Sequence, residues 1–145
     1  MRKLWVLAAL VTCPALAQTK PAAAPAPADY GATITYAEGV RIGEEYMRRN
    51  LADPQSAQFT WPYDFIPFTE KIRGYGHATG YATCFTMNAK NRYGGYVGPR
   101  QSRIVIRDGK VVDKMDVPEL KFVPDPCEEL VKGLNLPPAP TKPAS

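Results

Sequence analysis

The segment from Cys84 to Gly98 holds the densest group of chemically capable side chains in this 145-residue chain. It reads CFTMNAKNRYGGYVG. Aromatic rings pack against the apolar faces of sugars, while amides and guanidinium groups recognise hydroxyls and carboxylates. Its amides, cations and rings therefore predict a surface for a glycan or an anionic polymer. The residues of this candidate binding surface are Asn88, Lys90, Asn91, Arg92, Tyr93 and Tyr96.

The same segment also suits a purely structural turn between two strands. Asn88 and Asn91 tolerate left-handed backbone and can hydrogen-bond the local chain, and Gly94-Gly95 adds backbone freedom. The residue types favour this structural interpretation, and the binding interpretation stays open beside it.

Catalytic chemistry has little support elsewhere in the sequence. His77 is the single histidine, and neither a free thiol nor a G-x-S-x-G serine accompanies it, so a surface or structural role is favoured over a general base. One histidine and two cysteines cannot supply the usual three or four zinc ligands. The adjacent acids Glu44-Glu45 and Glu128-Glu129 point in different directions on helices. We predict a noncatalytic protein without a cofactor or metal.

The N-terminus predicts export. Met1-Arg2-Lys3 precedes an apolar run that closes with Ala15-Leu16-Ala17, so residues 1–17 form a signal peptide with an A-x-A cleavage site. The run is too short for a membrane-spanning helix, which needs about 20 residues. We expect a periplasmic or secreted protein after cleavage. The alternative is a lipid anchor through Cys13, because Leu10-Val11-Thr12-Cys13 loosely resembles a bacterial lipobox.

Removal of the signal peptide leaves two cysteines, Cys84 and Cys127. An even pair in an oxidising compartment predicts one disulfide. Closing a loop of this size would stabilise the fold by about 4 kcal/mol in the chain-entropy model. The alternative is two free thiols or half a metal site.

Composition divides the rest of the chain into three parts. Residues 18–32 form a Pro/Ala-rich linker and residues 137–145 a Pro-rich tail, both expected to act as spacers. Residues 33–136 form a single domain with one modest core.

The net charge and the predicted export both argue against a nucleic-acid partner. Cleavage of the signal peptide lowers the net charge from +4 to +2, and export makes nucleic acid an improbable ligand despite the basic, aromatic composition. The cations gather between Lys71 and Lys110, and the acids between Asp113 and Glu129. We favour the interpretation that these halves face each other or solvent over a basic face for an anionic partner.

The elements expected to position the candidate surface are few. Residues 35–51 predict a helix, capped by Thr35 with Glu38 completing a capping box. Its predicted face consists of Ala37, Val40, Glu44, Met47 and Leu51. Alternation predicts strands over 57–61 and 78–87, and an irregular loop over 63–69. Asp108-Gly109 predicts a type I′ hairpin over 103–113.

A short C-terminal helix is expected from Asp125 or Pro126 to Gly133. Cys127 on this helix, bonded to Cys84 on a central strand, would join helix to sheet. The predicted class is α+β: a small antiparallel sheet with an N-terminal helix and a short C-terminal helix, packed on one side, and one disulfide.

Two segments resemble an uncharacterised family of small exported or lipid-anchored bacterial proteins. Leu51 to Phe59 resembles its L-x-D-P-x-S-A-x-F segment, and Cys84 to Gly98 is similar to its C-x3-N-A-K-N-x-[YF]-G-G-Y-x-G motif. Arg92 stands where serine is more usual. The resemblance implies a bacterial, exported protein but no mechanism.

Three functions are compatible with these observations. The first is a noncatalytic periplasmic or envelope-associated binding module that uses the Asn88–Tyr96 loop against a cell-envelope glycan or protein. The second is an accessory or inhibitor protein whose braced loop inserts into the cleft of an envelope enzyme. The third is an unrecognised enzyme with His77 as base.

Overall fold

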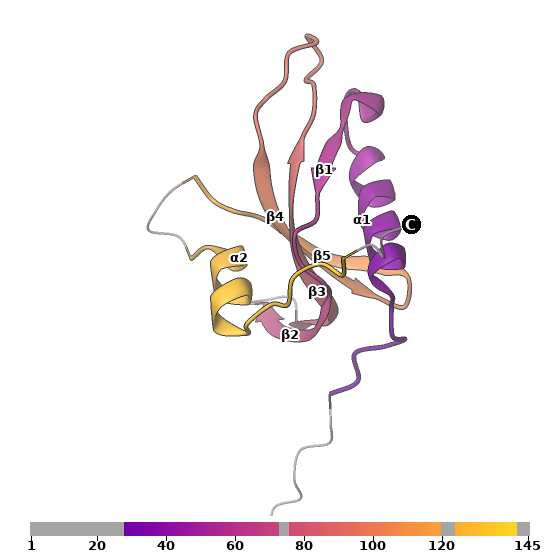
Figure 1. The fold of residues 1–145 in the computed structure, drawn as a ribbon, viewed down its shortest axis with the longest axis vertical. Coiled ribbons are helices and arrows are strands. Elements are labelled where there is room, and N and C mark those ends of the chain that lie inside the picture. The colour runs from indigo at the N-terminus through magenta and orange to yellow at the C-terminus, as the bar shows by residue number, and fades with distance from the viewer. Residues whose placement is uncertain (1–27, 73–75, 120–123, 142–145) are drawn as a thin grey trace, which may run out of the picture.

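A five-stranded antiparallel sheet lies between two helical segments in the computed structural model, which describes residues 28–72, 76–119 and 124–141 (Figure 1). The predicted α+β class is confirmed. The signal peptide, Cys13 and most of the predicted linker lie outside the described residues. In chain order the elements are α1 (Tyr36–Arg48), η1 (Pro54–Ser56), β1 (Gln58–Thr60), β2 (Ile66–Ile72), β3 (Gly76–Asn88), β4 (Arg100–Arg107), β5 (Lys110–Asp116), α2 (Pro126–Glu128) and the π-helical turn η2 (Glu129–Gly133).

Helix α1 begins where its capping signal predicts. Thr35 is the N-cap, and its side-chain oxygen accepts a hydrogen bond from the Glu38 backbone N–H at 3.3 Å. The carboxylate of Glu38 lies in the first turn, where the helix dipole favours negative charge. The helix ends at Arg48, before the predicted end at Leu51.

The face that α1 buries agrees only in part with the predicted one, because Met47 is buried and Val40 packs against the core. The buried residues are Gly39, Ile42, Gly43 and Met47, whereas Ala37 is exposed and Glu44 is only half-buried. A Cβ atom added to Gly39 would lie 2.4 Å from the Phe65 ring. Aromatic rings therefore occupy the space that side chains would need at Gly39 and Gly43, and a pattern of apolar side chains does not include glycines.

Strand β3 organises the sheet. It pairs with β4 along one edge and with both β1 and β2 along the other. The predicted irregular loop over 63–69 is wrong from Ile66 onward, because β2 begins there and continues to Ile72. Pro67 misled the prediction; within the described residues β2 pairs only with β3, and an edge strand tolerates proline where its missing N–H would face outward.

The β4–β5 hairpin is confirmed. Asp108 and Gly109 both have positive φ, 49° and 73°, as a type I′ turn requires. The pairing runs from Arg107–Lys110 to Ser102–Asp116, with an irregularity between Val105 and Ile106.

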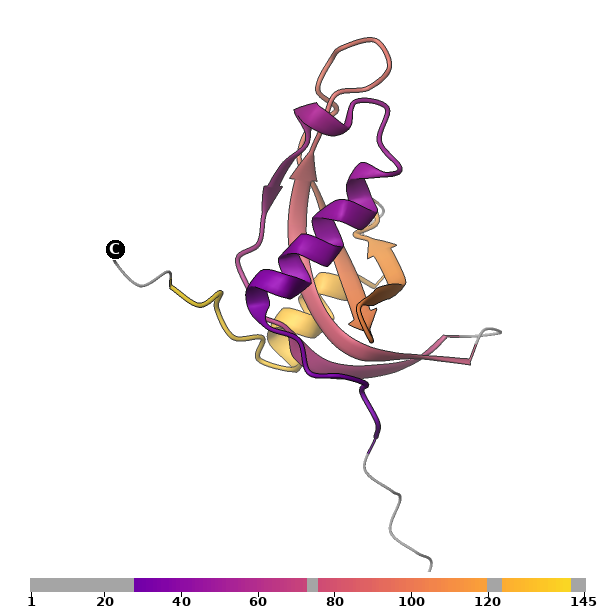
Figure 2. The same ribbon diagram turned by 90° about the vertical axis from the view of Figure 1, so that its right-hand side faces the viewer.

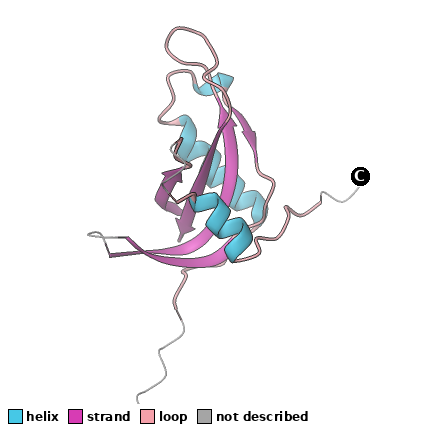
Figure 3. Ribbon diagram, turned by 90° about the vertical axis from the view of Figure 1, so that its left-hand side faces the viewer, coloured by secondary structure: helices cyan, strands magenta, loops and turns pink. Residues whose placement is uncertain are grey.

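The two helical segments cover opposite faces of the sheet, so the prediction that both pack on one side is wrong (Figures 2 and 3). Phe85, Ile104 and Ile106 form a core with α1. Cys84 and Val105 point the other way and pack with the C-terminal segment. A strand buried on both faces reads as a continuous apolar run, so its sequence does not show which face each helix covers.

The segments predicted as spacers contribute contacts. At the N-terminal end, the Ala32 N–H donates to Asp108 Oδ1 at 2.8 Å, and Arg107 Nη2 lies 2.7 Å from Asp29 Oδ2. The Gly31 N–H and the Arg107 guanidinium lower the pKa of the Asp29 carboxyl. This exposed contact is therefore complete at neutral pH and weakens only as the pH falls through that lowered pKa.

At the C-terminal end, the Asp64 N–H donates to the Pro137 carbonyl and the Ala139 N–H to the Pro62 carbonyl, both at 2.9 Å. The first residues of the predicted tail thus pair with the chain between β1 and β2.

Gly43→Ala tests the close packing of α1. Alanine raises intrinsic helix stability by about 1 kcal/mol, but its Cβ would lie 2.5 Å from the Trp61 ring. Overpacking costs roughly 1 to 3 kcal/mol, so we expect a net loss of about 1 kcal/mol in the free energy of unfolding, measured by urea denaturation. Gly133→Ala is the matched control, because nothing lies within 4 Å of an added Cβ there. An increase in stability for Gly43→Ala would contradict the packing argument.

Truncation of the C-terminus tests the contribution of Pro137 to Ala139. A chain ending at Leu136 lacks both hydrogen bonds to the Pro62–Asp64 segment, while a chain ending at Thr141 keeps them. At about 1 kcal/mol for each bond, the shorter chain should unfold more easily by roughly 1 to 2 kcal/mol. Equal urea midpoints for the two chains would show that the tail is only a spacer.

Candidate functional site

The predicted binding residues lie on or beside the long connection between β3 and β4, which we call the tyrosine loop (Ala89–Pro99). It projects from the end of the sheet, at the top of Figure 1. The base of the loop continues the hairpin, because the Val97 N–H donates to the Ala89 carbonyl and Lys90 bridges to Tyr96. The loop is therefore an ordered extension of two strands.

Asn91 shapes the turn at the apex. Its side-chain oxygen accepts hydrogen bonds from the N–H groups of Tyr93 at 2.9 Å and Gly95 at 3.2 Å. Its backbone carbonyl accepts a further bond from Gly94, whose φ of 82° is left-handed. The side-chain oxygen of Asn91 is thus engaged within the loop, as the structural interpretation predicts.

Asn88 lies at the end of β3, opposite Gln58 of β1, rather than on the projecting part. It is half-buried, and its Oδ1 atom is buried without a hydrogen-bond donor among the described residues. Of the two predicted asparagines, Asn91 therefore shapes the loop, and Asn88 belongs to β3.

The cations and tyrosines are the side chains that the loop presents. Tyr93 is 86% exposed, and Tyr96 is 48% exposed. The guanidinium carbon of Arg92 lies 5.7 Å from the centre of the Tyr93 ring, and the Lys90 ammonium lies 5.5 Å from that of Tyr96. Each such pair stabilises the exposed arrangement by about 0.5 to 1 kcal/mol. The loop thus carries two rings, each with its own cation.

Ser56 braces the loop from η1, and sequence reasoning did not identify this residue as part of the site. Its hydroxyl accepts a hydrogen bond from the Lys90 backbone N–H at 2.9 Å. Its carbonyl lies 3.4 Å from the Tyr96 hydroxyl. The two segments that carry the family resemblance therefore meet here. The occurrence of both segments in one chain was the only sequence signal that could have pointed to Ser56.

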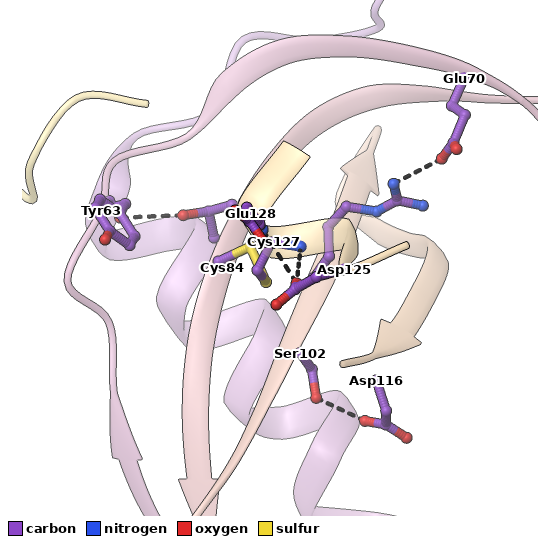
Figure 4. The surroundings of a disulfide bond; sticks show 10 residues. Tyr63, Glu70, Cys84, Ser102, Asp116, Asp125, Cys127 and Glu128 are labelled. Carbon is purple, nitrogen blue, oxygen red and sulfur yellow. Dashed lines mark hydrogen bonds and ion pairs between the residues drawn. A yellow bond between two sulfur atoms is a disulfide. The ribbon is translucent and has the colours of Figure 1, made fainter. Parts of the chain in front are cut away.

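The predicted disulfide is confirmed between Cys84 and Cys127, with Cα atoms 5.8 Å apart (Figure 4). Both cysteines are buried, so the bond lies inside the core between β3 and α2. Asp125 caps α2, because its Oδ1 accepts hydrogen bonds from the N–H groups of Cys127 and Glu128. The bond fixes β3 four residues before Asn88 and thus steadies the strand that leads into the loop.

Two cations of the basic segment pair with residues of the acidic segment. Arg103 is buried and contacts Asp113 at 3.0 Å, and Arg100 lies 3.6 Å from Glu119. These contacts agree with the interpretation that the basic and acidic halves face each other. Lys90 and Arg92 differ because their contacts are with aromatic rings.

His77 lies far from the tyrosine loop, at the opposite end of β3, where it is exposed and pairs with Lys71. Among the described residues, no group of three or more His, Cys, Asp or Glu side chains could hold a metal ion. Within the same part of the chain, no helix is long and apolar enough to cross a lipid bilayer.

Comparison with protein-family models, curated proteins and solved structures gives no match to this chain.

Ser56→Ala tests the brace of the tyrosine loop. The variant leaves the Lys90 N–H without its acceptor. Loss of one hydrogen bond of about 1 kcal/mol should speed hydrogen exchange of the Lys90 amide about fivefold. Thr60→Ala, on the exposed face of β1, is the control and should not change that rate. An unchanged rate in Ser56→Ala would show that the loop holds its shape alone.

Proposed function

We propose that this protein is a noncatalytic binding module of the cell envelope that contacts its ligand through the tyrosine loop. The observation that carries the proposal is the exposure of Tyr93, 86%, at the apex of a turn that other residues hold in shape. The export predicted from residues 1–17 supports an envelope location, and the Cys84–Cys127 disulfide is compatible with an oxidising compartment.

Exposed apolar area supports an interaction role for this loop. Tyr93, Tyr96 and Val97 are each about half exposed or more, and they lie within five residues of one another. Large apolar groups that gather on an exposed surface often mark interaction sites. Tyrosine and arginine are also enriched among residues that dominate binding energies. Folding buries little of Tyr93, which is 86% exposed.

The chemistry of the loop favours a ligand with both hydroxyls and negative charge. The exposed tyrosine rings offer apolar faces for sugar rings, and the nearby Lys90 and Arg92 attract carboxylates. A carboxylate-bearing envelope glycan such as peptidoglycan combines these features. We therefore favour this glycan class over a neutral polysaccharide.

Sedimentation with purified peptidoglycan tests the proposal. The double variant Tyr93→Ala/Tyr96→Ala should lose about tenfold or more in affinity, because truncating an aromatic anchor costs roughly 2 kcal/mol. Tyr46→Ala is the matched control, since Tyr46 is also partly exposed but lies on α1. The thermal midpoints of all three proteins should be compared. Equal retention of the loop variant and the wild type would refute the glycan function.

A second candidate is an accessory protein or inhibitor of an envelope enzyme. It is favoured by the shape of the loop, which projects beyond the sheet and could enter a recess (Figure 1). A photo-cross-linking residue at position 93 distinguishes the two. The accessory role would be favoured by a single cross-linked protein in envelope extract, together with equal glycan retention of the Tyr93→Ala/Tyr96→Ala variant and the wild type.

A further inference from the structure

A cavity of about 190 Å³ lies on the face of the sheet that carries the disulfide. β2 and β4 line it, together with the C-terminal helical segment. It is near the end of β3 that pairs with β2, whereas the tyrosine loop follows the other end. The lining residues that matter here are Phe68, Glu70, Arg103, Glu129, Leu130 and Leu134.

One wall of the cavity contains a charge cluster centred on the buried Arg103. The side chain of Arg103 is 2% exposed, and its guanidinium lies 4.9 Å from the centre of the Phe68 ring. Its Nη1 lies 2.6 Å from Glu70 and its Nη2 lies 3.0 Å from Asp113. One cation therefore faces two carboxylates, which leaves an excess of negative charge. Glu70 lies on the same side of the sheet as the disulfide (Figure 4).

The described residues leave a carboxylate oxygen of this cluster without a hydrogen bond. Glu70 Oε2 is buried and lies 2.6 Å from Arg103 Nη1, but it makes no aligned hydrogen bond there. Buried charges are normally both paired and hydrogen-bonded. An additional cation near Glu70 would balance the excess carboxylate.

The mouth of the cavity adds a second acid and apolar walls. Glu129 is exposed on its rim, Leu130 is buried, and Leu134 is 53% exposed. Pockets for drug-sized ligands span about 300 to 1,000 Å³, so this cavity suits a single side chain better. Apolar walls and carboxylates together match a long alkyl stem that ends in a positive charge.

We propose that this cavity is a docking site for one lysine side chain of a partner protein. The stem lies against Leu130 and Leu134, and the ammonium lies between the carboxylates of Glu70 and Glu129. The positive charge of Arg103 does not oppose this arrangement, because two carboxylates already neutralise it. The site is separate from the tyrosine loop and does not depend on the function proposed for that loop.

Titration with a capped Ala-Lys-Ala tripeptide, followed by the amide NMR shifts of the full-length protein, tests the proposal. We expect saturable shifts at Thr69, Glu70, Leu130 and Leu134, with a dissociation constant on the order of 1 mM. The same peptide with norleucine in place of lysine should give no saturable shift. Addition of 0.5 M salt should weaken binding, because the ion pairs at the rim are exposed. Equal binding of the norleucine peptide, or shifts that avoid these residues, would overturn the proposal.

Two adjacent acids supply a matched pair of variants. Glu129→Gln should weaken binding about threefold, as expected for an exposed ion pair. Glu128→Gln should not, because Glu128 pairs with Lys132 and does not line this cavity. Leu134→Ser removes an exposed apolar wall and should also weaken binding. Equal affinities for the Glu128 and Glu129 variants would rule out the assigned position of the ammonium.

Discussion

The Cys84–Cys127 disulfide is the constraint on which one half of the structure depends. The segment it attaches consists of a three-residue helix and one π-helical turn. Helices shorter than about 12 residues are marginal without tertiary contacts. The covalent bond holds this segment against β3, and Leu130 and Leu136 then complete a second core. The cavity beside Arg103 and the pairing of the C-terminal tail both follow from this attachment.

The other half of the structure depends on close approach between a helix and aromatic rings. Gly39 and Gly43 leave the surface of α1 bare, so Phe65 and Trp61 can lie directly on the helix backbone. Trp61 also stacks on Phe85 at 4.4 Å. The two glycines have no side chains to bury, and the rings of Phe65 and Trp61 supply the buried apolar surface in their place. Phe85 and Cys84 are neighbours on β3. The aromatic packing and the disulfide therefore both hold the strand that leads into the tyrosine loop.

In the tyrosine loop, the residues that hold the backbone in shape differ from the side chains that face solvent. Asn91 and Ser56 supply acceptors that hold its backbone, while the side chains of Tyr93 and Arg92 contact each other at the exposed apex. A preorganised loop loses little conformational entropy on binding. The cavity near Glu70 differs in kind, because its charge comes from a cluster that the core holds in place. The two surfaces lie towards opposite ends of β3, and the ligands we propose for them carry opposite charge.

Local sequence signals predicted several features correctly. The Asp108-Gly109 turn, the Thr35 cap and the strand over 78–87 depend on residues within a few positions of one another. The disulfide needed only the count of cysteines and an expected compartment. By contrast, the failed prediction over 63–69 arose because proline is read as a loop signal unless the strand is known to be an edge.

The sequence by itself determined the α+β class, the hairpin, the helix start and the disulfide, because each follows from neighbouring residues or from composition. Only the tertiary structure decided which face each helix covers and which acceptor braces the tyrosine loop. Ser56 and Lys90 are 34 positions apart, and no local rule joins them. Packing likewise placed Arg103 between two specific carboxylates, those of Glu70 and Asp113. Such contacts arise from packing, where distance in space no longer follows distance along the chain.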